Sequence, residues 1–162
     1  MNDKITFQNL VTVELEDGTV LSRKFNAQTL DNRNMLIDLY DGTNPTSAIN
    51  LSLNVFYINA DTVGSPNSLA ITSSDDETTE PTGSSVEAWG YEKTLRLFSG
   101  SDIGDPDRGG LIVRGRIYFP IESSLIRIDM LDSGNSITLF NSEQDELIPA
   151  GRSARITYRI GV

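Results

Sequence analysis

The 162-residue chain contains no cysteine and no histidine. Without cysteine it has no disulfide framework, no thiolate nucleophile and no thiolate metal site. Without histidine it has no Ser-His-Asp triad, no imidazole general base and no imidazole zinc site. Any catalysis would have to use carboxylates, hydroxyls, lysine, arginine or tyrosine. We therefore expect a protein that is not an enzyme and that holds no cofactor or metal ion.

Long apolar segments are also lacking. No run approaches the roughly 18–20 residues that a membrane-spanning helix needs. The first residues, 1–5, are not followed by the apolar core of a secretory signal peptide. These absences predict a protein that is synthesised in a cytosol and has no membrane partner.

Basic residues are scarce and unevenly placed. The chain has 13 Lys and Arg against 23 Asp and Glu, a net charge of −10, whereas domains that bind nucleic acid usually carry a basic surface. Residues 1–92 hold the whole surplus of negative charge. Residues 93–162 are balanced and carry eight of the ten arginines. We expect no nucleic-acid partner.

The residues that are present favour β-structure. Ser, Thr, Asn, Asp and Gly total 70 of the 162 residues and Ala only seven, a composition rich in turn formers and poor in helix formers. Apolar residues alternate with polar ones in three segments, which is the period of a half-buried strand. These segments are 48–59, 111–119 and 152–162.

Weaker strand patterns lie between turn signals such as Asp17-Gly18, which is typical of a tight hairpin. They cover residues 11–15, 19–25, 34–40, 69–72, 86–91, 93–98, 124–131 and 136–140. Helical alternatives are a helix over 29–39 and a single turn over 143–148. The length suits one domain. We therefore predict an all-β fold over residues 1–162: a single β-sandwich, jelly-roll-like, with about 8–10 antiparallel strands.

One segment, residues 73–85, contains no apolar side chain and four acids. Such a segment cannot build a core of its own. We expect it to form a long exposed loop, called the acidic loop below, near the middle of the chain.

Acidic residues provide only weak candidates for chemistry. Most of them stand in turns, where local hydrogen bonding and solvation explain them. The loop at 102–110 spaces Asp102, Asp105 and Asp107, but it lacks the Asp-x-Asp-x-Asp-Gly pattern of a calcium loop and contains Arg108. We read it as a plain acidic loop.

Arginines give the strongest signal. Arg114 and Arg116 lie two residues apart, and Arg155 and Arg159 lie four apart, so each pair shares one face of its strand. If the two strands are neighbours, the four side chains form a basic stripe. Arginine is enriched at protein interfaces and lysine is depleted. The alternative is that these arginines pair with acids on adjacent strands of the same molecule.

A second alternative function is carbohydrate binding. Trp89 and Tyr91 lie close to Glu87 in a predicted strand, and together with Tyr118 they are the candidate stacking surfaces. Aromatic rings on a strand can stack against sugar rings, as in a carbohydrate-binding or adhesin-like sandwich. The competing interpretation is that the tryptophan packs against its own sheet.

In composition and strand pattern the whole chain resembles the small β-sandwich and jelly-roll proteins of viruses and phages. These are head decoration (cement) proteins, minor capsid proteins, and neck or tail accessory proteins. The segment 147–152, which leads into the last long strand, is part of that resemblance; no specific motif is. The resemblance implies a non-enzymatic virion protein that contacts copies of itself, a major capsid protein or another shell protein.

Overall fold

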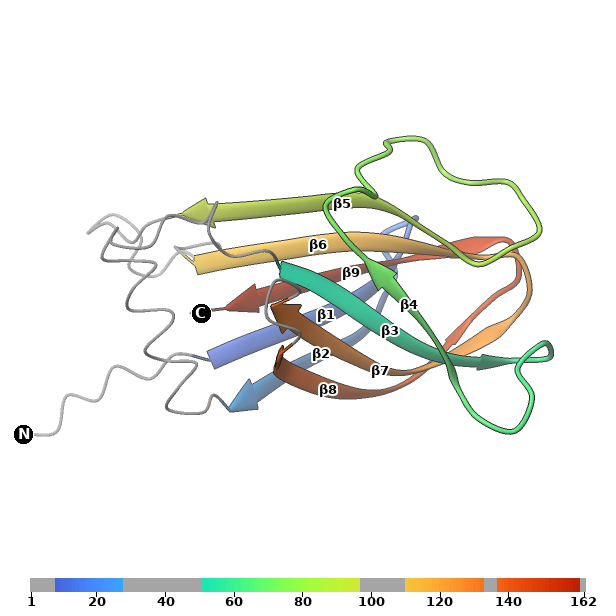
Figure 1. The fold of residues 1–162 in the computed structure, drawn as a ribbon, viewed down its shortest axis with the longest axis horizontal. Helices are drawn as coiled ribbons and strands as arrows, with labels where there is room; N and C mark the ends of the chain where they lie inside the picture. Colours follow the sequence, from blue (N-terminus) through green and yellow to red (C-terminus); the bar gives the residue numbers. More distant parts are fainter. Residues whose placement is uncertain (1–7, 28–50, 97–109, 133–136, 161–162) are drawn as a thin grey trace, which may run out of the picture.

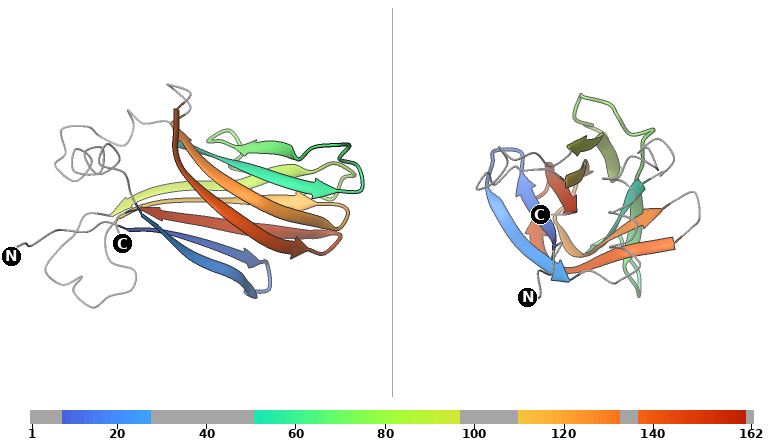
Figure 2. Two further views of the ribbon diagram at one scale, coloured as in Figure 1. Left: turned by 90° about the horizontal axis from the view of Figure 1, so that it is seen from below. Right: turned by 90° about the vertical axis from the view of Figure 1, so that its left-hand side faces the viewer.

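The computed structural model describes residues 8–27, 51–96, 110–132 and 137–160, which form two antiparallel sheets packed face to face (Figures 1 and 2). These residues contain nine strands and no helix. The strands are β1 (Gln8–Leu15), β2 (Val20–Ala27), β3 (Leu51–Asn59), β4 (Asn67–Ile71), β5 (Glu87–Arg96), β6 (Gly110–Phe119), β7 (Ser123–Asp132), β8 (Ile137–Ile148) and β9 (Arg152–Ile160). The predicted all-β sandwich is confirmed. The described residues include no helix with the length and hydropathy of a membrane span.

The chain builds the two sheets from hairpins. One sheet has five strands in the order β2-β1-β9-β6-β5, and the other has four in the order β4-β3-β7-β8. The hairpins β1–β2 and β5–β6 lie in the five-stranded sheet, and β3–β4 and β7–β8 lie in the four-stranded sheet. The last strand, β9, inserts between β1 and β6. This insertion places the two arginine-bearing strands side by side.

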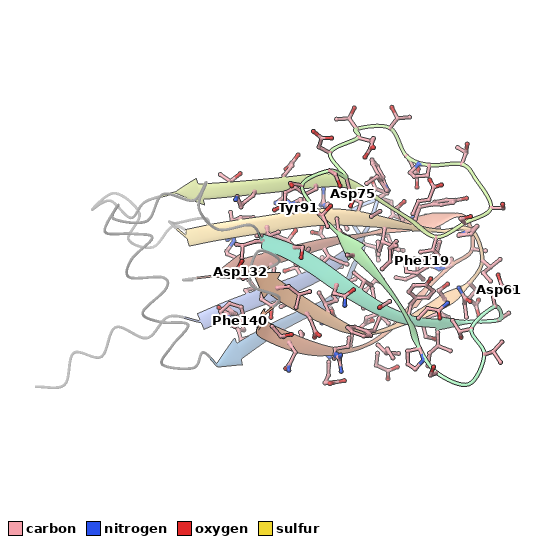
Figure 3. The ribbon with its side chains drawn as sticks, in the orientation of Figure 1. Asp61, Asp75, Tyr91, Phe119, Asp132 and Phe140 are labelled. Carbon is pink, nitrogen blue, oxygen red and sulfur yellow. The ribbon has the colours of Figure 1, made fainter. Side chains whose placement is uncertain are left out.

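Alternation along the strands separates core from surface as predicted. In β9, Ala154, Ile156 and Tyr158 are fully buried between the sheets. The core also contains aromatic pairs that link the two sheets: Tyr57 meets Phe119 edge-on at 5.4 Å between ring centroids, and Phe140 stacks on Tyr158 at 6.0 Å. Figure 3 labels two of these rings, Phe119 and Phe140. The burial of these apolar faces provides the main driving force for folding.

The Asp17-Gly18 hairpin forms where the sequence predicts it. Gly18 has φ +88°, a left-handed conformation that glycine adopts without steric cost. Asp17 Oδ1 accepts a hydrogen bond of 3.0 Å from the backbone N–H of Thr19. Hydrogen bonding from Thr19 lowers the pKa of the Asp17 carboxyl, because these bonds favour the charged form.

Two strand predictions are wrong in detail. Residues 86–91 and 93–98 were expected to be separate strands, but β5 runs continuously from Glu87 to Arg96 through an irregularity at Gly90. Residues 143–148 do not form a helical turn, because they extend β8 to Ile148. The expected strand at 34–40, the helical alternative at 29–39 and nearly all of the loop at 102–110 lie outside the described residues.

The polar sequence of β8 has a structural explanation. Ser142 and Gln144 are buried, and Ser22 Oγ on the edge strand β2 donates a hydrogen bond of 2.6 Å to Gln144 Oε1. Lys24 Nζ, also on β2, donates to the Glu143 carbonyl at 2.8 Å. These side chains close the sandwich on the β2–β8 side without a backbone ladder.

The acidic loop closes the opposite side. It connects β4 to β5 and lies across the outer edge of β5 (Figures 1 and 3). The backbone N–H of Gly90 donates to the Glu77 carbonyl at 2.9 Å, and that of Tyr91 donates to the Asp75 carbonyl at 2.8 Å. The loop therefore satisfies strand-edge donors that are otherwise open to pairing with another chain.

Candidate functional site

The two arginine pairs predicted from the sequence come together on one surface. Strands β6 and β9 are hydrogen-bonded neighbours, and Arg116 lies directly opposite Arg155. Arg114 lies opposite Thr157, and Arg159 lies opposite Ile112. All four arginines are on the side of the five-stranded sheet that faces away from the core. This surface is called the arginine face below. The sequence predicted a basic stripe if the two arginine-bearing strands were neighbours, and β6 and β9 are neighbours.

Intramolecular pairing, the alternative interpretation, is also present. Arg155 Nη2 lies 2.9 Å from Glu14 Oε2 on β1. Arg116 Nε lies 3.3 Å from Glu16 Oε1, and Arg114 Nη1 lies 3.6 Å from Glu92 Oε2 on β5. The acids come from strands or turns beside β6 and β9, so pairing follows from the register of the sheet. Arg114, Arg116 and Arg155 therefore each have a carboxylate partner within the same molecule.

These ion pairs position the guanidinium groups more than they stabilise the fold. The side chains of Arg114, Arg116 and Arg155 are 34%, 21% and 32% exposed. Ion pairs of this exposure contribute about 0–1 kcal/mol. A guanidinium has five N–H donors, and a single carboxylate engages only one or two of them. The remaining donors stay available on a surface where the side chains are already held in place.

Trp89 is part of this face, but not as an open stacking platform. Its ring is 6% exposed, and the guanidinium carbon of Arg116 lies 5.0 Å from the ring centroid. Its indole Nε1–H donates a hydrogen bond of 3.1 Å to Ser153 Oγ on β9. Trp89 thus packs against its own sheet beneath Arg116.

Tyr91 does not share a face with Trp89. The register shift between Trp89 and Glu92 adds a residue to β5, which turns Tyr91 into the core (Figure 3). The Tyr91 hydroxyl donates a hydrogen bond of 2.6 Å to the Leu51 carbonyl, and burial raises the pKa of the phenol. Neither predicted stacking ring is therefore an open surface: Trp89 is covered by Arg116 and Tyr91 is internal.

A hollow of about 240 Å³ lies on the arginine face and is called the arginine hollow. Its lining is Leu10, Thr12, Glu14, Arg23, Arg114, Thr157 and Arg159. Sequence reasoning found Arg114 and Arg159 but missed Arg23, because only the pairing of β1 with β2 brings Arg23 to the same surface.

A second hollow, of about 490 Å³, lies between the acidic loop and the edges of β4 and β5. Its lining includes Asp75, Glu77 and Glu87 beside Leu69 and Trp89. Among the described residues, no group of three or more acidic side chains is placed to hold a metal ion. This second hollow is therefore acidic without having the geometry of a metal centre.

The four-stranded sheet carries a charged pair on β7, Arg127 with Asp129, and Glu143 of β8 lies opposite Arg127. The guanidinium of Arg127 lies 4.0 Å from the centroid of the Phe56 ring, and its Nε lies 3.1 Å from Asp129 Oδ1. Asp129 is buried, and burial raises its pKa despite the neighbouring cation. Among the described strands of this sheet, Arg127 is the one arginine, and it already covers the Phe56 ring.

Comparison of the chain with protein-family models, with curated proteins and with solved structures gives no match.

Proposed function

We propose that this protein is a non-enzymatic structural protein that acts through protein–protein contacts made by the arginine face. In its particular form, we propose a virion protein, either a capsid decoration (cement) protein or a minor capsid protein. Its partners would be other copies of the chain, a major capsid protein or another shell protein.

The observation that carries the proposal is the direct cross-strand position of Arg116 and Arg155. Two guanidiniums on adjacent strands repel each other unless carboxylates offset their charge. Glu16 and Glu14 supply that charge and hold the two side chains in position. Arginines fixed in this way lose less side-chain entropy when a partner binds, which favours their use in an interface.

The charge of the chain indicates what kind of partner fits. The molecule carries a net charge of −10, so a second copy presents an excess of carboxylates to the arginine face. The acidic loop is one such source, because Asp76, Glu77 and Glu80 are all exposed. Complementary charges of this kind favour specific orientation and fast association.

The virion role is supported by the sandwich itself and by the whole-chain resemblance described above. The described strands form a two-layer frame that is closed at the β2–β8 side by side-chain bonds and at the β5 edge by the acidic loop. Such a frame presents two broad sheet faces, which suits a protein that works by contact.

Light scattering tests the contact function. We expect the mass of the purified protein to exceed the 17.8 kDa monomer as concentration rises at low salt, and to fall towards it at high salt as charge contacts are screened. A 17.8 kDa particle under all conditions would contradict self-association. For the virion role, the protein should sediment with purified particles; its absence from them would contradict that role.

A further inference from the structure

We propose that the arginine hollow is an oxyanion-binding site, which takes a phosphate or carboxylate group of a small ligand. This inference goes beyond the proposed function, because the hollow would bind such a group whether or not the protein assembles.

The register of the sheet creates the hollow. Arg23 of β2 lies opposite Thr12 of β1. Thr12 in turn lies opposite Thr157 of β9, which lies opposite Arg114 of β6. Two short side chains therefore stand between two long, cationic ones, and Glu92 of β5 continues the row beyond Arg114. Each strand contributes one residue to the row. The hollow forms because the two threonine side chains are shorter than the arginine side chains on either side of them.

Residues of the two neighbouring cross-strand rows form the rest of the lining of the hollow. Arg159 lies next to Leu10 in one row, and Glu14 lies next to Arg155 in the other. Glu14 is the one acid in the lining, and its carboxylate is engaged by Arg155 at 2.9 Å. Three guanidiniums and one carboxylate therefore line the hollow, and Glu92, which lies outside the lining, pairs with Arg114 at 3.6 Å. On a chain of net charge −10, this is a local concentration of positive charge.

The floor supplies hydroxyl groups. Thr157 is 7% exposed, and its Oγ1 accepts a hydrogen bond of 3.1 Å from Arg114 Nε. The same bond fixes the Arg114 guanidinium over the row and leaves the Thr157 hydroxyl proton free to be donated. Guanidiniums and hydroxyls are the donors that recognise phosphate and carboxylate, with arginine forming bidentate bonds to either.

The dimensions limit the ligand. A hollow of about 240 Å³ is smaller than the roughly 300–1,000 Å³ of sites that enclose a drug-sized molecule. It suits one anionic group. Arg23, which is exposed and has no ion pair with another described residue, stands at the open side and is placed to contact the rest of a ligand.

The experiment is a titration at constant ionic strength, followed by calorimetry and by the melting temperature of the full chain. One arm uses inorganic phosphate, one uses acetate, and chloride is the reference. We expect saturable binding of phosphate, acetate or both, with a rise in melting temperature beyond that in chloride. The anion that binds more tightly shows whether the site prefers a tetrahedral oxyanion, such as phosphate, or a planar one, such as acetate.

Variants locate the site. Arg23→Gln and Arg114→Gln should each weaken binding about tenfold or more, because each removes charged hydrogen bonds. Arg152→Gln is the matched control: Arg152 is a partly buried arginine that pairs with Asp17 and lies outside the hollow, and its variant should bind like the wild type. Because Arg23 is exposed on an edge strand, its variant is expected to fold. Binding of neither anion, or equal binding by all four proteins, would overturn the proposal.

Discussion

The hydroxyl of Ser153 on β9 donates a hydrogen bond of 2.6 Å to Glu80 Oε1 in the acidic loop, across 73 residues of sequence. The same buried oxygen accepts the indole N–H of Trp89 at 3.1 Å. Trp89 in turn lies beneath the Arg116 guanidinium. One serine thus connects the acidic loop, the bulged edge strand and the arginine face.

Replacing Ser153 should weaken the packing of the acidic loop, of the edge strand β5 and of the arginine face. Ser153→Ala leaves the buried Trp89 N–H without its acceptor, and we expect the free energy of unfolding to fall by about 1–3 kcal/mol. Ser73→Ala is the control, because Ser73 is an exposed serine of the same loop. Denaturant unfolding followed by the fluorescence of the single tryptophan measures both variants. Equal stability of the two would show that the hydrogen bond to Ser153 contributes nothing.

Gly90 should be the least replaceable residue of β5. It has φ +67°, and an added Cβ would collide with the side chain of Arg116. Gly90→Ala therefore combines the cost of a left-handed alanine, about 1–2 kcal/mol, with displacement of Arg116 from Trp89.

Gly151 provides a comparison that separates the backbone cost from the cost of displacing Arg116. It has φ +75° but no atom within 4 Å of an added Cβ, so Gly151→Ala should cost only the backbone term. We expect the loss in unfolding free energy to be larger for Gly90→Ala by about 1 kcal/mol or more. In an Arg116→Ala background the excess should disappear. Equal losses in the original background would contradict the packing of Arg116 over Gly90.

Gly115 should be intolerant of any side chain for a different reason. It lies on β6, and an added Cβ would come within 2.6 Å of Ile71 Cγ2, a fully buried side chain on β4 of the other sheet. We expect Gly115→Ala to destabilise the protein by about 1–3 kcal/mol through overpacking. Gly83→Ala, whose nearest contact is 3.8 Å away, should be close to neutral. Thermal unfolding measures both variants. Equal melting temperatures for Gly115→Ala and Gly83→Ala would refute the close contact between the two sheets at Gly115.

The buried carboxyl of Asp129 should make stability depend on pH. Burial raises its pKa above the unfolded value near 3.8, so the folded state binds the proton more tightly. Its favourable contribution is present below the unfolded pKa and is lost as the pH rises through the folded pKa. Asp129→Asn should therefore gain stability relative to the wild type as the pH rises from about 3.8 into the neutral range.

Unfolding curves of the wild type and of Asp129→Asn over this pH range measure the difference. Asp76→Asn, a change in an exposed loop acid, corrects for the loss of one charge. If Asp129→Asn instead loses stability relative to the wild type as the pH rises, the ion pair with Arg127 outweighs the cost of burying the carboxylate.

Alternation alone was enough to predict much of the fold. The inward set Ala154, Ile156 and Tyr158 and the outward set Arg155 and Arg159 follow from a period of two, and the hairpin follows from Asp17-Gly18. These features are local, because each depends on residues within one strand or turn. The neighbouring positions of Arg116 and Arg155 could be stated only as a condition, since strand order is a property of the whole chain.

The failures have physical causes too. The irregularity at Gly90 was missed, although a glycine inside a strand pattern is a sign of a bulge. Residues 143–148 were read as a possible turn because their polarity hides the alternation. Gln144 is buried only because Ser22 of a distant strand satisfies it. The second error comes from a long-range partner that the sequence of one strand does not encode.

The mass of an arginine-face variant tests the central claim most directly. The claim is that Arg116 and Arg155 form a contact surface, so light scattering should compare the double variant Arg116→Gln/Arg155→Gln with the wild type and with Arg152→Gln. We expect the wild type and Arg152→Gln to associate equally at low salt, and the double variant to remain at 17.8 kDa. A double variant that associates like the wild type would contradict the claim.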